Sequence, residues 1–195
     1  MPLPHFIPAD LKLIRDAFDH DDFIFELKMD GFRALAHVGP DETRLVSRKG
    51  NVFKTFPALA TSIHVDLDCE AVLDGEIVIS DSDGRPQFYG LLKRPGLGEP
   101  VFFYSFDLLW LNGEDLRARP LIERKRLLRS IVPEQPSVLL YADHIERNGV
   151  EFFRADVRAG SGGHCREAQA RVIRREVVQD SESELFAARR TSGVV

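Results

Sequence analysis

The segment that most constrains the fold is the run from Val101 to Leu111, which is apolar or aromatic apart from one Ser and one Asp. A run of this length and character is typical of a buried strand. Alternating or apolar runs between turn residues predict further strands at 23–28, 32–38, 44–48, 69–80 and 138–145, with a break in the strand 69–80 at Asp74-Gly75. Apolar residues at helical spacing predict helices at 9–18, 56–63 and 121–132, and a helical turn at 89–94. This mixture predicts an α+β fold with a largely antiparallel sheet.

Length and charge set limits on the class of protein. The 195 residues, 44% of them hydrophobic, suffice for one domain with a sizeable core. The net charge of −5 argues against a uniformly cationic DNA-binding surface but allows a local basic patch. Two cysteines indicate neither a disulfide framework nor a metal site, so we expect a reduced, cytoplasmic setting. No apolar run is long enough for a secretion signal or a membrane span.

The strongest local signal is the octapeptide Glu26-Leu-Lys28-Met-Asp30-Gly31-Phe-Arg33. It predicts a hairpin in which the strand 23–28 pairs with the strand 32–38 across a turn at Asp30-Gly31. A lysine in a partly dry pocket beside other cations loses affinity for its proton, so Lys28 could attack as a neutral amine. Gly31 would let the backbone approach a ligand, and Arg33 could meet a phosphate or ribose. The alternative is a charged hairpin tip with a solvated lysine.

Three later segments carry weaker signals. Residues 47–50, Ser-Arg-Lys-Gly, place cations at a turn that could equally be a solvated turn. In residues 73–78, Glu76 lies inside an apolar strand, where a buried carboxylate needs a metal ion, a ribose hydroxyl or a cation, unless the strand is an exposed edge. The aromatic side chains of residues 104–109 could form a purine platform, although such residues more often belong to a core.

The order and spacing of these segments resemble the ATP-dependent DNA ligases, in the covalent nucleotidyltransferase superfamily that includes RNA ligases and mRNA capping enzymes. The octapeptide matches the nucleophile motif Glu-x-Lys-x-Asp-Gly-x-Arg. Ser47-Arg-x-Gly50, Asp74-Gly-Glu-Ile-Val78 and Phe106-Asp-Leu-Leu109 follow in the family's order. The stretch from Trp110 to Leu128 resembles the linker and helix of the bacterial end-joining type, which favours a DNA ligase over a capping enzyme. The resemblance runs from about Phe6 to Ala155.

The resemblance implies a nucleotidyltransferase (ATP-grasp-like) adenylation domain, with antiparallel sheets flanked by helices, that acts with ATP and Mg²⁺ on nicked double-stranded DNA in DNA repair or recombination. Lys28 would attack the α-phosphate of ATP, expel pyrophosphate and hold AMP through a phosphoramidate; AMP would then pass to the 5′-phosphate of the nick, and the 3′-hydroxyl would displace it. The other implied roles are Glu26 beside the adenine, Phe106 stacked on it with Tyr104 as an alternative, Asp30 and Arg33 ordering the site and the ribose or nick end, Arg48 on the ribose or phosphate, and Glu76 on the ribose or the metal.

The family pattern stops near residue 155. After Phe153 the family continues with a Glu-Gly-x-Val-x-Lys motif, a later Lys-x-Lys motif and an OB-fold domain, none of which appears here. If the first base is dropped, permitted codons for residues 160–167 can read Asp-Leu-Glu-Gly-Ile-Val-Ala-Lys. The same shift lets residues 177–187 read Trp-Phe-Lys-Ile-Arg-Asn-Pro-Asn-Phe-Ser-Gln. Two family-like motifs in one frame suggest a frameshift near Ala155 or Asp156, in the gene or in its sequencing.

This hypothesis divides the chain into an incomplete adenylation domain, residues 1–155, and an out-of-frame, disordered tail, residues 156–195. The Arg-, Gly-, Ser- and Glu-rich composition of the tail buries too little to offset its ordering entropy. A genuine divergent C-terminus is the alternative. For the function, impaired nick sealing is expected; the alternatives are an RNA ligase or capping-type enzyme, and a non-catalytic remnant that binds nucleotide weakly.

Overall fold

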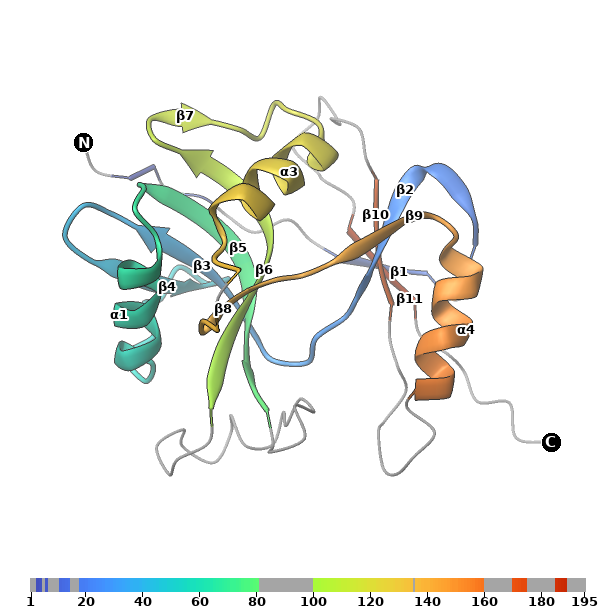
Figure 1. The fold of residues 1–195 in the computed structure, drawn as a ribbon, viewed down its shortest axis with the longest axis horizontal. Helices are drawn as coiled ribbons and strands as arrows, with labels where there is room; N and C mark the ends of the chain where they lie inside the picture. Colours follow the sequence, from blue (N-terminus) through green and yellow to red (C-terminus); the bar gives the residue numbers. More distant parts are fainter. Residues whose placement is uncertain are drawn as a thin grey trace. The chain divides into compact units, whose positions relative to one another are not determined.

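The computed structural model describes residues 3–4, 6, 11–14, 18–80, 100–134, 136–159, 170–174 and 185–188 (Figure 1). Its contacts divide the chain into two compact units. We call Met1–Pro8 with Met29–Tyr141 the first unit, and Ala9–Lys28 with Ala142–Val195 the second unit. Each unit contains its own sheet.

The first unit is built on a sheet that has six strands among the described residues, in the order β4-β3-β5-β6-β7, with β8 also paired to β6. The strands are β3 (Phe32–Val38), β4 (Thr43–Ser47), β5 (Ala71–Ile79), β6 (Val101–Leu111), β7 (Glu114–Asp115) and β8 (Leu139–Tyr141), and the helices are α1 (Pro57–Asp66) and α3 (Leu121–Ile131). The pairing is antiparallel throughout except for β8, which runs parallel to β6.

One face of this sheet carries the main core. Alternate apolar residues of β3, β5 and β6, such as Ala34, Ile77 and Phe103, are fully buried there. They pack in one cluster with Ile63 of α1 and Leu128 of α3. Because successive strand residues point to opposite faces, the residues between them, including Arg33 and Glu76, lie on the other face.

The second unit contains the strands β1 (Leu11–Ile14), β2 (His20–Leu27), β9 (His144–Arg147), β10 (Ala170–Arg174) and β11 (Leu185–Ala188), and the helix α4 (Gly149–Ala159). Their order in the sheet is β1-β11-β10-β2-β9. Antiparallel partners flank β2 on both sides, and β1 runs parallel to β11. With antiparallel pairing dominant in both sheets, the α+β prediction is confirmed.

Four predictions about local structure are wrong. The strand β5 runs through Asp74-Gly75 without the predicted break, because both residues pair in register with β3. The predicted helix at 9–18 is a strand over Leu11–Ile14, where pairing with β11 outweighs a short helical spacing of apolar residues. The predicted hairpin does not form, since β2 pairs with β9 and β10 whereas β3 pairs with β4 and β5. The single strand predicted at 138–145 is divided into β8 and β9, which belong to different sheets.

Other elements agree with the sequence pattern or lie beyond it. The strands β3 and β6 have the predicted bounds, and α1 and α3 lie where helices are predicted. The helix α4 was not predicted, and it runs across residue 155. Within 156–195, where a disordered tail is expected, the structure has β10 and β11; the altered reading frame stays a prediction. The helical turn predicted at 89–94 falls outside the described residues.

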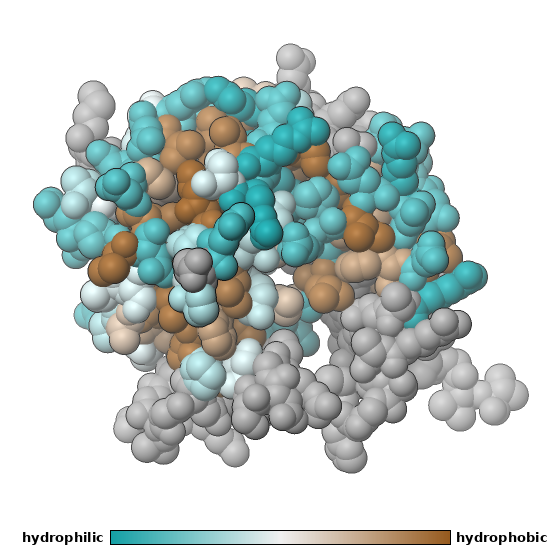
Figure 2. Space-filling view, in the orientation of Figure 1, coloured by the Kyte–Doolittle hydropathy of each residue, from teal (hydrophilic) through white to brown (hydrophobic). Residues whose placement is uncertain are grey.

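On the face in Figure 2, hydrophilic and apolar side chains of the described residues are intermingled. Within the described ranges, the large apolar side chains that are well exposed are those of Leu27, Val52 and Val65. Among the described residues, no helix is long and apolar enough to cross a membrane.

Gly31 packs directly against β5. A Cβ atom placed on this residue would lie 2.1 Å from the backbone oxygen of Ile77, far inside the van der Waals limit. Within the first unit, Gly31 therefore allows two backbone segments to pack closely together. The sequence had instead suggested that it allows the backbone to approach a ligand.

We expect Gly31→Ala to lower the free energy of unfolding by about 3 kcal/mol, because backbone must move to admit the methyl group. Urea denaturation followed by circular dichroism measures the loss. Gly39→Ala is the control, since a Cβ there meets nothing closer than 3.4 Å. Equal denaturation midpoints for the two variants would contradict this account of Gly31.

Candidate functional site

Polar and aromatic residues gather on the face of the first unit's sheet that lies opposite the main core. Arg33 on β3 pairs in register with Glu76 on β5, which pairs with Tyr104 on β6. Residues that are directly opposite share a face, so these three form a row across the central strands. Asp74, two residues before Glu76 on β5, lies on the same face. Burial raises the pKa of the Tyr104 hydroxyl, which therefore stays protonated.

Arg33 is fixed by a two-pronged ion pair with Asp74. Its Nε and Nη2 atoms lie 3.1 and 2.7 Å from the two carboxylate oxygens, and the side chains are only 11% and 5% exposed. Burial alone would lower the pKa of Arg33, but the charge and hydrogen bonds of Asp74, with further help from Glu76, raise it above its ordinary value. The guanidinium carbon also lies 5.5 Å from the centroid of the Phe106 ring.

Phe106 is the extra residue of a bulge in β6. The β5–β6 register pairs Gly75 with Ser105 and Asp74 with Asp107, which leaves Phe106 without an opposite residue. A bulge of this kind bends the strand and re-aims a side chain. Phe106 is 4% exposed and faces the Arg33 guanidinium. An aromatic ring, a cation held by an ion pair and the carboxylate of Glu76 therefore lie on one face of the sheet.

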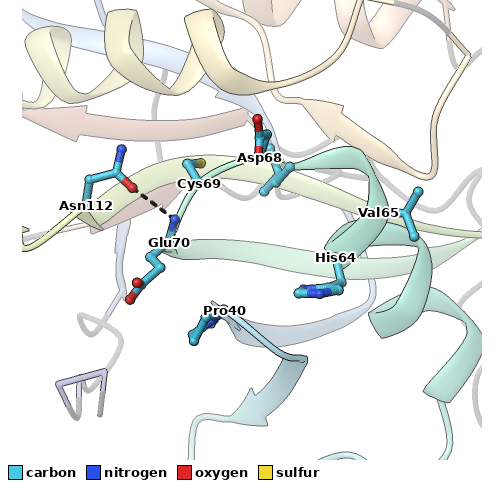
Figure 3. A pocket seen from close by; sticks show the side chains of 9 residues that line it. Pro40, His64, Val65, Asp68, Cys69, Glu70 and Asn112 are labelled. Atoms are coloured by element: carbon cyan, nitrogen blue, oxygen red, sulfur yellow. Dashed lines mark hydrogen bonds between the residues drawn. The ribbon is translucent and has the colours of Figure 1, made fainter. Parts of the chain in front are cut away.

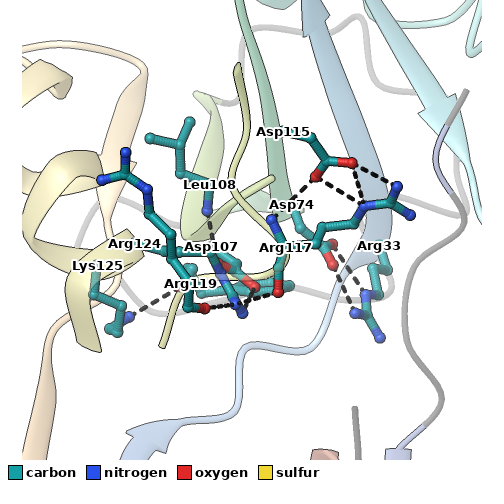
Figure 4. A network of polar contacts seen from close by, with 10 residues as sticks. Arg33, Asp74, Asp107, Leu108, Asp115, Arg117, Arg119, Arg124 and Lys125 are labelled. Carbon is teal, nitrogen blue, oxygen red and sulfur yellow. Dashed lines mark hydrogen bonds and ion pairs between the residues drawn. The ribbon is translucent and has the colours of Figure 1, made fainter. Parts of the chain in front are cut away.

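The helix α3 holds the other side of this bulge (Figure 4). Arg124 donates from Nε and Nη2 to the carboxylate oxygens of Asp107, at 2.8 and 2.9 Å. The next residue, Lys125, donates from Nζ to the backbone oxygen of Phe106 at 3.0 Å. Consecutive residues of one helix thus contact the consecutive residues Phe106 and Asp107.

Two predicted site residues of the first unit lie in exposed connections. Arg48 is in the turn that follows β4, where Gly50 has a φ of 79° and its N–H donates to the backbone oxygen of Ser47 at 2.8 Å. Asp30 lies between β2 and β3. Arg48 and Asp30 are both exposed, so their side chains are accessible to a ligand.

The remaining predicted site residues, Glu26 and Lys28, belong to the second unit. Glu26 lies on β2, fully buried, in register with His144 of β9. Lys28 follows the last residue of β2 and is partly buried. The structure therefore brings Arg33, Glu76 and Phe106 together in one unit, and the nucleophilic role of Lys28 stays a prediction.

Sequence reasoning missed the residues that support the site, namely Asp74 as the partner of Arg33, and Asp107, Arg124 and Lys125 around Phe106. A signal for one of them was present. Lys125 stands four residues after Leu121 and three before Leu128, so it occupies the apolar stripe of the helix, and all three residues are buried. A lysine on such a stripe indicates a buried cation with a specific partner.

A separate depression in the first unit, of about 550 Å³, is lined by Gly39, Pro40, His64, Val65, Leu67, Asp68, Cys69, Glu70 and Asn112 (Figure 3). It includes none of the predicted site residues. Burial, followed by the charge of Asp68, raises the pKa of the Cys69 thiol, which makes it a weak nucleophile. In the described part of the chain, no group of three or more His, Cys, Asp or Glu side chains is arranged as a metal site.

Comparisons with known proteins point to one family. Residues 7–159 match the family described as the ATP dependent DNA ligase domain. The SPbeta prophage-derived DNA ligase-like protein LigB of Bacillus subtilis is 30% identical over 150 residues, which are 75% of this chain and 54% of that protein. The multifunctional non-homologous end joining protein LigD of Pseudomonas aeruginosa is 31% identical over 134 residues, 67% of this chain and 16% of that protein.

A solved structure agrees. Mycobacterial DNA ligase D complexed with ATP and MES has a TM-score of 0.72 and 25% identity, covering 93% of this chain and 60% of that one. The match supports the predicted fold, a nucleotidyltransferase domain with antiparallel sheets and helices. With this coverage it extends beyond residue 159, where the family match ends. The chain spans about half the length of LigB and a smaller part of LigD.

Proposed function

Since this chain belongs to the family of ATP-dependent DNA ligases and carries their adenylation domain, we propose that it transfers AMP from ATP to its own Lys28 and onward to nicked DNA. The observation that carries the proposal is the meeting of Phe106, Arg33 and Glu76 on one sheet face. An aromatic ring suits a purine base, and a cation beside a carboxylate suits a ribose with its phosphate.

The proposed reaction has three steps. The Nζ atom of Lys28 attacks the α-phosphorus of ATP; the N–P bond forms, the bond to the pyrophosphate oxygen breaks, and the amine proton passes to solvent. A 5′-phosphate oxygen of the nick then attacks the same phosphorus; the N–P bond breaks, and the lysine amine leaves with a proton taken up from solvent. Finally, the 3′-hydroxyl attacks the 5′-phosphorus and loses its proton to solvent; the phosphodiester forms, the bond to AMP breaks, and AMP is released.

Each site residue has a proposed role in holding the nucleotide. Phe106 stacks on the adenine, and Glu26 lies beside it. Arg33, with its guanidinium already oriented by Asp74, binds the ribose or the nick end without further ordering of its side chain. The exposed side chains of Arg48 and Asp30 reach the nucleotide from connections between strands; Arg48 meets the ribose or phosphate.

Mg²⁺ fits this site through Glu76. Its carboxylate lies on the same sheet face as Arg33 and Tyr104, with which it is in register, and the family resemblance gives it the ribose or the metal. Proteins commonly hold Mg²⁺ with one or two carboxylates and substrate phosphates. When bound, the ion shields the charge of the triphosphate.

The biological setting is also a proposal. We propose a role in DNA repair or recombination, in the cytoplasm, with nicked double-stranded DNA as the substrate. Since the family's later lysine motifs do not appear in the reading frame of residues 156–195, we propose that these 195 residues seal nicks poorly.

Labelling with nucleotide tests the function. The chain is incubated with Mg²⁺ and α-phosphate-labelled ATP or GTP, separated on a denaturing gel, and chased with nicked DNA or nicked RNA. We expect a slow covalent label from ATP alone and transfer to nicked DNA. A chain that takes label from GTP, transfers only to RNA, or takes no label at all would argue against an ATP-dependent DNA ligase.

A further inference from the structure

The bulge in β6 places Phe106 outside the regular pairing of the sheet, so the sheet alone does not fix its ring. Ordinary ladder residues are held by a partner on the neighbouring strand, whereas the β5–β6 register passes from Ser105 to Asp107 and skips Phe106. A ring that is to receive a base needs an orientation set within about 0.5 Å by its supporting residues. Such support must come from outside the β5–β6 ladder.

Lys125 supplies one such support. Its side chain is fully buried, its Nζ donates to the Phe106 backbone oxygen at 3.0 Å, and the same Nζ lies 4.9 Å from the centroid of the Tyr141 ring. A buried ammonium loses its hydration, which costs free energy. Replacing a buried charged residue with an apolar one therefore often leaves the stability of the fold unchanged or raises it. Stability therefore gives no reason for a lysine between Leu121 and Leu128 on the stripe of α3.

Arg124 supplies the second support. Its two-pronged contact holds Asp107, the residue that follows the bulge, with side chains 11% and 16% exposed. Asp107 in turn accepts from the backbone N–H of Leu108 at 2.8 Å, which fixes the chain where the ladder resumes. The Nη1 atom of Arg124 also donates to the backbone oxygen of Arg119 at 2.7 Å. Arg124 therefore links the bulge to the segment that precedes α3.

We propose that Arg124 and Lys125 are positioning residues for the nucleotide base. From α3, Lys125 holds the backbone oxygen of Phe106 and Arg124 holds the carboxylate of Asp107, and through these contacts they set the orientation in which the Phe106 ring meets adenine. They touch no reacting atom. This inference rests on the proposed function, because it assigns the Phe106 ring to the base of ATP.

The test separates base recognition from phosphate recognition. Calorimetric titrations with MgATP and with inorganic tripolyphosphate are compared for the chain and for Lys125→Met. Base stacking on an aromatic side chain accounts for roughly a tenfold change in affinity, so we expect ATP to bind about tenfold more weakly while tripolyphosphate binding is unchanged. Arg126→Met is the matched control, since it removes an exposed cation from the same helix.

Lys125→Met should keep its thermal unfolding midpoint. If Lys125→Met does not fold, Arg124→Lys tests the inference instead. This change replaces the planar guanidinium, which makes two hydrogen bonds to Asp107, with a single ammonium. We expect ATP binding to weaken about threefold and tripolyphosphate binding to stay unchanged. Unchanged ATP affinity, or an equal loss for both ligands, overturns the inference. Failure of the unaltered chain to bind ATP overturns the proposed function instead.

Discussion

Replacing Lys28 with alanine should abolish the covalent AMP label, with a loss of more than about 1000-fold, because removal of the proposed nucleophile leaves only the uncatalysed background. The measurement is the rate at which labelled ATP marks the chain on a denaturing gel. Acid should also release labelled AMP from the unaltered chain, because acid cleaves the P–N bond of a phosphoramidate.

Lys54→Ala is the matched control for this experiment, since it removes an exposed lysine that has no proposed role in the site. Its label should equal that of the unaltered chain, while Phe106→Ala should weaken ATP binding without removing the nucleophile. A label that survives in Lys28→Ala would take Lys28 out of its proposed role and leave the family resemblance without its central residue.

Restoring the alternative reading frame near codon 155 should raise nick sealing by at least about 100-fold over the 195-residue chain. The restored frame supplies lysines at the α-phosphate, and cations that stabilise a transferring phosphoryl group contribute orders of magnitude in rate. The measurement is the sealing of a nicked duplex at equal protein concentration, by the chain and by a version whose reading frame is shifted by one base.

The gene provides the first check of this prediction. Its nucleotide sequence beyond codon 155 should contain, in the shifted frame, the Glu-Gly-x-Val-x-Lys and Trp-Phe-Lys motifs without stop codons. Substituting alanine for the lysine of the first restored motif should remove the gain in sealing. Stop codons in that frame, or efficient sealing by the chain as it stands, would refute the frameshift and favour a genuine divergent C-terminus.

Local periodicity predicted the elements whose pattern is strong and missed the long-range pairing. The apolar run of β6 and the amphipathic spacing of α3 contain enough residues to distinguish strand from helix. The four residues of β1 do not, and the sequence contains no local record that β1 pairs with β11. The Asp30-Gly31 pair is typical of a hairpin turn and lies between two strands, so it predicted that those strands pair. Turn residues do not reveal which strands pair, and here β2 pairs with β10 whereas β3 pairs with β5.

For the site, the motifs predicted residues that the first unit brings together, but they did not predict how those residues are supported. Arg33, Glu76 and Phe106 share a face, while the roles that the resemblance implies for them stay predictions. The contacts of Asp74 and Lys125 depend on the register of β3 with β5 and on the packing of α3, which are tertiary properties. A motif lists residue types along the chain, so it does not predict these contacts between distant side chains.

In the proposed function Phe106 receives the base, and the bulge then separates nucleobase preference from the register of the sheet. Because the β5–β6 register skips this residue, a smaller or differently shaped side chain here need not shift the partners of Ser105 or Asp107. The proposed platform is thus open to evolutionary or engineered retuning, for example toward enlarged purine analogues, while the strand that carries it keeps its alignment.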